Sequence, residues 1–191
     1  MIVNRKTCMK YSAGILPYAV DNGKIYYLLG RDWRDYGWSD FGGKYESGDL
    51  CVKYTACREF YEETMGCVYT FDTLYDILQN PANCTEIKSM TLSGYPYYMY
   101  LIQIPYLNYK TIFFKILSFT KYINRGMSRH SMFFEKNSVQ WFDSSFMKRM
   151  ACANLNNHIK TQMRLRGIFK QTVKHHMNEI IKHEDSIIST R

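Results

Sequence analysis

Three glutamates crowd one short segment of this chain, and their spacing could support metal chemistry. Glu59, Glu62 and Glu63 follow Arg58 within the run "VKYTACREFYEET", which contains no glycine or proline. On a helix each residue advances by about 100°, so the three carboxylates share one narrow stripe. Two carboxylates about 5 Å apart repel by roughly 3 kcal/mol at an effective dielectric constant of about 20. A divalent cation relieves that repulsion, and oxygen ligands favour Mg²⁺ or Mn²⁺. A solvated acidic face is the alternative interpretation.

The residues around this stripe extend the pattern. Gly42 and Gly43 precede the predicted helix, Lys44 follows them, and Asp49 supplies another acid near the helix start. The segment resembles the signature of the Nudix hydrolases, which places a glycine, an acid, an Arg-Glu pair, a Glu-Glu pair and a final glycine at set spacings. The matching positions are Gly43, Asp49, Arg58, Glu59, Phe60, Glu62, Glu63 and Gly66.

This chain departs from the family signature in ways that bear on the site. Asp49 stands where the family has Glu, and one extra residue separates it from Arg58. One extra residue also precedes Gly66, and Phe41 takes the place of the usual proline. The glutamate stripe is unaltered. In the family the acid and the arginine hold the loop against the helix, and we expect a weakened contact here because Asp49 is shorter and displaced.

The resemblance implies a hydrolase that uses Mg²⁺ or Mn²⁺ to cleave a diphosphate linkage between a nucleoside and another group. It implies that Glu59 and Glu63 bind metal directly and that Glu62 is a ligand or the group that activates water. The implied catalytic residues are Glu59, Glu62 and Arg58. The implied metal ligands are Glu59, Glu62, Glu63, the Gly42 carbonyl and Glu135. For Glu135, which precedes Trp141 in the sequence, a surface loop acid is the alternative.

Basic and aromatic side chains near the stripe are candidates for binding a substrate. The candidates are Lys44, Arg31, Arg34 and Trp33. Trp33, Tyr36 and Trp38 follow a predicted strand and could stack on a nucleotide base. Ordinary core packing is the alternative for these three aromatic side chains.

The remaining sequence predicts an α/β sandwich of the Nudix type with a mixed sheet. Residues 12–20 and 24–33 read as a hairpin across "DNG". Residues 67–78 and 96–107 are predicted strands, and residues 111–123 fit a helix or a strand. Residues 137–150 are predicted to form a strand that leads into a helix capped by Asp143 or Ser144. We expect a hydrolase domain over residues 1–150 and a basic helical extension over 151–191, with a break near Gly167.

Charge and cysteine usage set the expected partners and compartment. The net charge is +8, and residues 148–191 hold nine Lys or Arg against three Asp or Glu. A basic end favours a polyanion such as nucleic acid, and a solvated helix is the alternative. The five residues expected to form one helical patch are Lys160, Arg164, Arg166, Lys170 and Lys174. The six cysteines form no CxxC pair, and no apolar leader precedes them, which favours a reducing cytoplasm, with the nucleus as the alternative. The longest apolar stretch is too short to span a membrane.

These features favour the 5′ end of RNA as the substrate, which would make the chain a decapping enzyme. The alternatives among small molecules are a dinucleotide polyphosphate, ADP-ribose or another nucleoside diphosphate sugar, and a nucleoside triphosphate such as a damaged nucleotide. A non-catalytic RNA-binding module with a Nudix fold is the alternative from another class.

Overall fold

The computed structural model describes residues 10–123, 135–153 and 164–189. Within these residues seven strands form one mixed sheet. The strands are β1 (Ser12–Asp21), β2 (Lys24–Asp32), β3 (Trp38–Ser39), β4 (Phe41–Lys44), β5 (Cys84–Met90), β6 (Pro96–Gln103) and β7 (Lys136–Asp143). β1 runs parallel to β6, whereas the other pairings are antiparallel.

β1 lies at the centre of the sheet and changes partner along one edge. Its first half pairs with β4, and its second half pairs with β2. Asn22 and Gly23 have φ values of 48° and 72°, which produce the tight turn between β1 and β2, so the predicted hairpin is confirmed. The pairing with β4 places Gly14 opposite Gly42, where a Cβ on Gly14 would come within 2.8 Å of the Gly42 Cα. The absence of side chains here lets the two strands approach closely.

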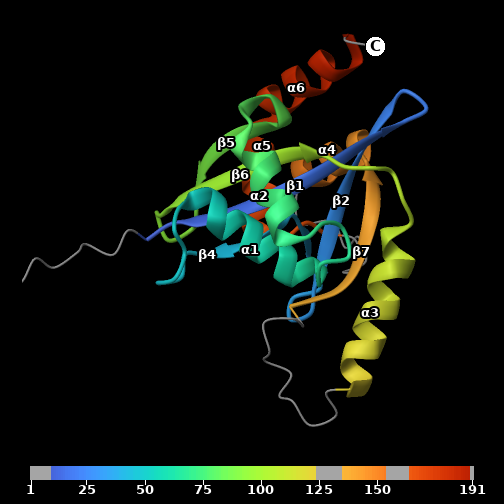
Figure 1. Cartoon of the computed structure of the whole chain (residues 1–191). Helices are drawn as coiled ribbons and strands as arrows, with labels where there is room; N and C mark the ends of the chain where they lie inside the picture. Colours follow the sequence, from blue (N-terminus) through green and yellow to red (C-terminus); the bar gives the residue numbers. More distant parts are fainter. Residues whose placement is uncertain (1–9, 124–134, 154–163, 190–191) are drawn as a thin grey trace, which may run out of the picture.

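Six α-helices in the described residues cover the two faces of the sheet (Figure 1). They are α1 (Val52–Thr64), α2 (Phe71–Gln79), α3 (Tyr109–Ile123), α4 (Ser144–Cys152), α5 (Gly167–His175) and α6 (Met177–Ser189), with a short 3₁₀ helix η1 (Pro81–Asn83). The buried residues of α1, α2 and α3 pack with Ile15 on one face, and those of α4, α5 and α6 pack with Leu16 on the other. Neighbouring residues of β1 thus serve opposite cores, as strand geometry requires. The predicted α/β sandwich with a mixed sheet is confirmed. None of these helices has the length and apolar character needed to cross a membrane.

One predicted strand is wrong. Residues 71–79, within the segment predicted as a strand, form α2. The Thr70 side chain accepts a hydrogen bond from the Thr73 backbone N–H at 3.3 Å and so caps the helix. Leu74 and Leu78 are four residues apart and both are buried in the core, so the apolar spacing is helical.

The structure also decides the predictions for residues 111–123 and 137–150. Residues 109–123 form α3, which resolves the choice between helix and strand. β7 leads directly into α4, and Asp143 is the N-cap of that helix. Its Oδ1 accepts hydrogen bonds from the backbone N–H groups of Ser145 (2.8 Å) and Phe146 (3.2 Å). The predicted cap is confirmed.

The C-terminal helices belong to the same core as the sheet. Leu165 forms a parallel bridge with Trp38, and Phe169, Val173 and Ile180 are buried in the cluster beneath α4. α5 begins at Gly167, after the non-helical residues 164–166, and the chain also breaks between α5 and α6 at His176. Residues 154–163 lie outside the described residues. The division of the chain at residue 150 stays a prediction.

A buried carboxylate attaches α6 to the rest of the fold. Glu184 accepts hydrogen bonds from the Tyr27 hydroxyl (2.8 Å), the Ser144 hydroxyl (2.5 Å) and the Lys148 ammonium (2.6 Å). These donors come from β2 and α4, so one side chain joins three elements. Buried polar groups of this kind are costly to leave unpaired.

We expect Glu184→Gln to lower the free energy of unfolding by about 2–3 kcal/mol, because it weakens the Lys148 pair and puts an amide where only acceptors fit. Denaturant unfolding followed by circular dichroism measures this. Asp185→Asn is the matched control, since it removes the same charge at an exposed neighbouring position. Equal unfolding midpoints for Glu184→Gln and the parent would contradict the anchoring role.

Candidate active site

Helix α1 presents the acidic stripe and ends as its sequence demands. Met65 and Gly66 follow the helix with φ values of 53° and 65°, and their N–H groups donate to the carbonyls of Glu62 (3.1 Å) and Tyr61 (2.9 Å). This left-handed ending is the reason for a glycine here. On the opposite side, Phe60 is fully buried, so the apolar face fixes the rotation of the helix. The predicted bounds of the helix are confirmed.

Arg58 is the counterion of the crowded carboxylates. Its guanidinium contacts Asp49 Oδ1 from Nε at 2.9 Å, Glu62 Oε2 from Nη1 at 3.1 Å, and Glu59 Oε1 from Nη2 at 3.1 Å. Nη2 also donates to the Lys44 carbonyl at 2.9 Å. The planar fork of arginine suits such a set, because its donors point in fixed directions. One cation therefore joins the glycine loop to two members of the stripe.

The expected weakening of the Asp49–Arg58 contact is wrong. Asp49 binds the guanidinium through both carboxylate oxygens, at 2.9 and 3.1 Å, and is buried. The reason is a turn: the Asp49 N–H donates to the Glu46 carbonyl at 2.9 Å, which takes up the extra residue and brings the shorter acid to the helix. Burial alone would raise the pKa of Asp49. Hydrogen bonds from Arg58, the Glu46 N–H and Thr55 outweigh burial and lower that pKa.

Asp49→Asn is therefore expected to have a clear effect rather than a silent one. The asparagine keeps the shape of the side chain but loses the charge that pairs with Arg58. We expect the free energy of unfolding to fall by about 1–3 kcal/mol, and kcat/KM on a diphosphate substrate to fall tenfold or more, which corresponds to about 1.4 kcal/mol. Denaturant unfolding and steady-state kinetics of the same preparation measure both. A variant that matches the parent in both measurements would contradict this assignment.

The two glycines of β4 allow the stripe to approach the sheet. A Cβ added at Gly43 would lie 2.3 Å from Glu59 Oε1, so only glycine leaves space for that carboxylate. The Gly42 N–H donates to Glu63 Oε2 at 2.9 Å. The paired glycines thus contact both the first and the last glutamate of the stripe. This is a physical reason for the double glycine in the signature.

Glu63 forms a buried ion pair that the sequence did not predict. Lys136 Nζ lies 3.1 Å from Glu63 Oε1 and donates to the Ser39 hydroxyl at 2.9 Å. The Lys136 and Glu63 side chains are 0% and 1% exposed. Lys136 opens β7 next to Glu135, and nothing local in the sequence distinguishes it from a surface lysine.

Burial changes the acidity of the stripe. It raises the pKa of Glu63 to about 8, although the Lys136 charge opposes the shift. It raises the pKa of Glu59 to about 7, with Arg58 opposing and the charge of Glu62 adding to the rise. The charge of Glu135 adds to both increases in pKa.

The donor atoms of this site suit a divalent cation. Glu63 is buried, with Oε1 paired to Lys136 at 3.1 Å and Oε2 accepting from the Gly42 N–H, and the Gly43 cradle keeps the Glu59 carboxylate at the loop. Carboxylate and carbonyl oxygens are the ligands that Mg²⁺ and Mn²⁺ prefer. In the part of the chain described, no three Asp, Glu, His or Cys side chains converge closely enough to form a complete metal site. In this structure Arg58 and Lys136 balance the charge of the carboxylates. The oxygen atoms of the site fit a divalent cation by their chemistry.

The predicted substrate-binding residues occupy two places. The Trp33 N–H donates to the Glu135 carbonyl at 2.9 Å, which puts the exposed Trp33 beside the acid that lies near the stripe. The Arg31 guanidinium stacks on Tyr36 at 5.1 Å, and Arg34 is exposed on the same loop. Lys44, by contrast, follows the glycines on β4. Trp38 is buried in the core, so packing explains it and base stacking does not.

The single basic helical patch predicted for the C-terminal region is wrong. α5 begins at Gly167, so Arg164 and Arg166 precede the helix, and Lys160 lies outside the described residues. Arg166 pairs with Asp32 at 3.3 Å and with Asp35 at 3.7 Å. Arg164 donates to the Asp35 carbonyl, and Lys170 donates to the Ala153 carbonyl. These cations attach the C-terminal region to the β2–β3 loop and to α4, and their charge is partly used within the fold.

The comparisons by sequence do not assign the chain to a family. No protein-family model matches the chain. The uncharacterized protein L534 of Acanthamoeba polyphaga mimivirus is 40% identical over 91 residues, which cover 36% of this chain and 30% of that protein. The chain thus matches less than a third of the length of this curated relative.

Two solved structures resemble the whole chain. The Nudix domain of Shewanella oneidensis NrtR, crystallised with ADP-ribose, has a TM-score of 0.50 at 10% identity, covering 89% of this chain and 87% of that one. A MutT/nudix family protein from Enterococcus faecalis has a TM-score of 0.52 at 11% identity, covering 91% and 62%. The chain therefore has the Nudix fold.

Proposed function

We propose that this chain is a metal-dependent Nudix hydrolase that cleaves a diphosphate linkage between a nucleoside and another group. The observation that carries the proposal is the Arg58 network, in which one guanidinium holds Asp49, Glu59 and Glu62 beside the paired glycines. A solvated acidic face has no need of a half-buried arginine that fixes its acids in place. Preorganised charges of this kind are what transition-state stabilisation requires.

The residues have separate roles in the proposed reaction. Glu59 and Glu62 would hold the cation, with Glu63, Glu135 and the Gly42 carbonyl as further oxygens. When bound, the cation neutralises charge on the phosphate oxygens and lowers the pKa of the attacking water. Glu62 or Glu59 accepts the proton of that water. Arg58 keeps both carboxylates in position.

Binding of the substrate falls to side chains on either side of the stripe. Lys44 provides a positive charge for a phosphate next to the glycines. The exposed Trp33 offers a flat face for a nucleotide base, and Lys121 Nζ already lies 5.0 Å from the centre of its ring. Arg31, near the end of β2, and Arg34, on the loop that follows, add positive charge.

The leading substrate is the 5′ cap of RNA, because the chain is strongly basic and a capped RNA carries both a diphosphate linkage and a polyanionic chain. The alternatives are the small diphosphates: a dinucleotide polyphosphate, ADP-ribose or a related sugar nucleotide, and a nucleoside triphosphate. ADP-ribose has one specific support, since it is the ligand of the NrtR Nudix domain that shares the fold.

A substrate screen tests the proposal. Purified protein is incubated with capped RNA, ADP-ribose, a dinucleotide polyphosphate and a nucleoside triphosphate, each with Mg²⁺ or Mn²⁺. We expect the cap nucleotide to be released from the RNA, and we expect EDTA to abolish this release. Turnover of small diphosphates without turnover of capped RNA would move the substrate to the alternative class. No turnover of any substrate would overturn the enzymatic proposal.

The Lys136–Glu63 pair supports a second candidate, a non-catalytic module with the Nudix fold. A buried ammonium already occupies one member of the stripe. In that case the site would bind a nucleotide or an RNA end without cleaving it. Binding of capped RNA in Mg²⁺ with no turnover in the same screen would favour this candidate.

A further inference from the structure

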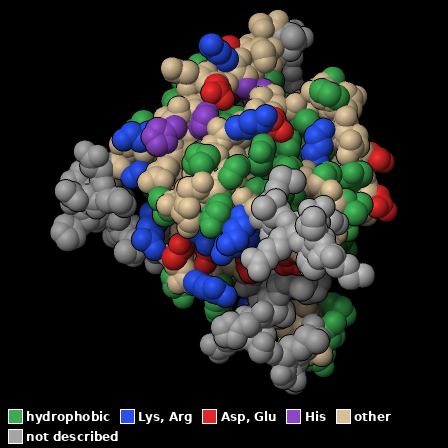
Figure 2. Space-filling view, turned by 90° about the vertical axis from the view of Figure 1, so that its left-hand side faces the viewer, with side chains coloured by type: hydrophobic (Ala, Val, Ile, Leu, Met, Phe, Trp, Pro, Cys, Tyr) green, Lys and Arg blue, Asp and Glu red, His purple; other side chains and the backbone are tan. Residues whose placement is uncertain are grey.

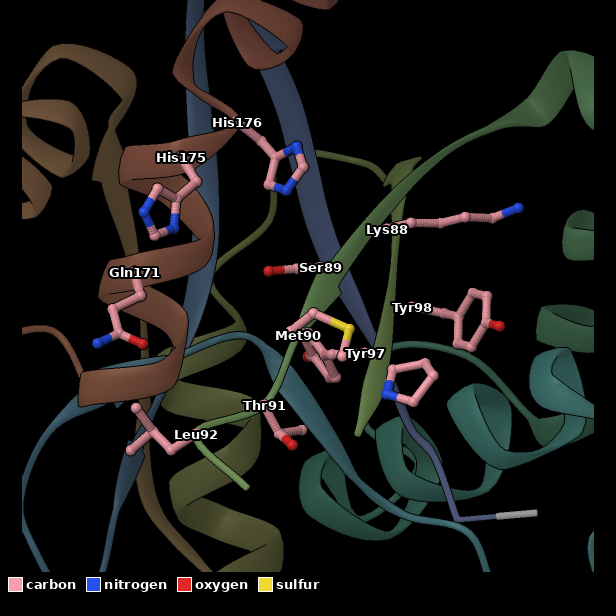
Figure 3. Close-up of a pocket in the computed structure, with 11 residues that line it drawn as sticks. Lys88, Ser89, Met90, Thr91, Leu92, Tyr97, Tyr98, Gln171, His175 and His176 are labelled. Atoms are coloured by element: carbon pink, nitrogen blue, oxygen red, sulfur yellow. The ribbon is translucent and has the colours of Figure 1, made fainter. Parts of the chain in front are cut away.

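Three hollows meet at Thr91, in the turn between β5 and β6, and together we call them the Thr91 trough. The largest, of about 680 Å³, lies between β5 and α5 (Figure 3). In Figure 3, Gln171 and His175 lie on α5, His176 lies at the end of this helix, and Ser89 lies on β5. Lys88 and Tyr98 lie on the other side of the β5 strand.

The other two hollows continue this space toward the paired glycines. The second, of about 450 Å³, is lined by Lys10, Tyr11, Lys44, Tyr45 and Tyr95, among others. The third, of about 140 Å³, reaches Asp40, Gly42, Gly43 and Arg166. Thr91 lines all three hollows. The three hollows therefore adjoin at Thr91, between α5 and the paired glycines.

The inner end of the trough borders the carboxylate stripe. Gly42 and Gly43 line the smallest hollow, and the same two residues contact Glu63 and Glu59. A molecule in the trough would thus end one backbone away from the proposed site of cleavage. Each of the two larger hollows has the volume of a small-molecule site. Three adjoining hollows suit a ligand of several units better than a single nucleotide.

The described lining has the chemistry of a nucleic-acid groove. Its charged side chains are Lys10, Lys44, Lys88, Arg166 and the buried Asp40. Lys88 pairs with Glu86 at 3.1 Å and Arg166 with Asp32 at 3.3 Å, so among the described residues the charge available to a ligand comes mainly from Lys10 and Lys44. The face shown in Figure 2 carries lysine, arginine and histidine side chains around a central apolar area. Tyrosines stand between the cations: Lys10 lies 5.6 Å from the ring centre of Tyr95, and Lys88 lies 5.8 Å from that of Tyr98. Alternating cations and aromatic rings bind phosphates and bases without reading a sequence.

We propose that the Thr91 trough binds the chain of a single-stranded polynucleotide whose end lies beside the paired glycines. This inference rests on the proposed function, because it names the substrate class of the same site. It assigns phosphate contacts to Lys10 and Lys44, which line the second hollow, and base stacking to Tyr95, which is 40% exposed. The histidines and Gln171 form the outer wall, beyond the first few nucleotides.

Binding is measured in EDTA, so that no cleavage is needed, by fluorescence anisotropy of labelled single-stranded 12-mers of RNA and of DNA. We expect Lys10→Gln/Lys44→Gln to weaken binding about tenfold at low salt. The slope of log affinity against log salt should flatten by about 1.4, because each phosphate contact on a single strand contributes about 0.7. Tyr95→Leu should weaken binding roughly fivefold to tenfold with the salt slope unchanged. Dinucleotides should bind far more weakly than 12-mers.

The matched control is Lys110→Gln/Lys115→Gln, which removes the same charge from exposed positions on α3. It should keep the parental affinity and slope. The proposal is overturned if both double variants bind equally, if dinucleotides bind as tightly as 12-mers, or if a duplex binds as tightly as a single strand. Because binding is read without a divalent cation, a chain that binds the 12-mers but cleaves nothing would fail the proposed function and still support the trough.

Discussion

Glu59→Gln is expected to lower kcat on the diphosphate substrate by on the order of a hundredfold or more while the protein stays folded. The Glu59 carboxylate lies in the Gly43 cradle and against Arg58, so a glutamine keeps the volume and can still accept the Nη2 hydrogen bond. What it removes is the charge that binds the cation and stabilises the transition state. Steady-state kinetics over a range of Mg²⁺ and Mn²⁺ concentrations measure the effect.

Glu46→Gln is the matched control for this variant. Glu46 also faces Arg58, at 3.7 Å from Nη1, but its side chain is 64% exposed and is not part of the stripe. We expect turnover close to that of the parent. A folded Glu59→Gln protein with near-parental kcat at every metal concentration would remove Glu59 from the catalytic set.

Local rules predicted the parts of the fold that depend on local interactions. The helix of the stripe, the β1–β2 turn at Asn22 and Gly23, and the Asp143 cap each follow from residues a few positions apart. The strand predicted over 67–78 is wrong because the apolar spacing of this segment is helical, with Leu74 and Leu78 on one face.

Contacts between distant segments were beyond sequence reasoning. Arg164 and Arg166 read as part of a free basic helix, yet they are bonded to the Asp32–Asp35 segment of the β2–β3 loop. The Asp49 contact was misjudged for a similar reason, since the turn at Glu46 that restores it depends on how the loop folds back on the helix. Lys136 gave no signal, because a lysine beside an acid at the start of a strand is usually solvated.

The Lys136–Glu63 pair should have the largest effect on stability. We expect Lys136→Met to lower the free energy of unfolding by about 3–5 kcal/mol, because a buried carboxylate is left without its cation. Methionine is a fair replacement for the lysine stem, which packs against Gly30, where an added Cβ would meet Lys136 Cδ at 2.9 Å. Glu63→Gln should also lower the free energy of unfolding, because it leaves the buried Lys136 ammonium without its carboxylate. A loss of activity in that variant alone would therefore not separate a metal ligand from a structural partner.

The double variant Lys136→Met/Glu63→Gln separates these contributions. It buries no unpaired charge, so its loss in free energy of unfolding should be well below the sum of the two single losses. We expect denaturant unfolding to give a coupling energy of about 2 kcal/mol or more. Glu86→Gln/Lys88→Met is the exposed comparison, since Lys88 is 70% exposed in its pair with Glu86, and its coupling should stay below about 1 kcal/mol. Additive losses at Lys136 and Glu63 would contradict a direct interaction. A stable double variant that no longer cleaves the diphosphate would show that Glu63 serves the reaction as well as the fold.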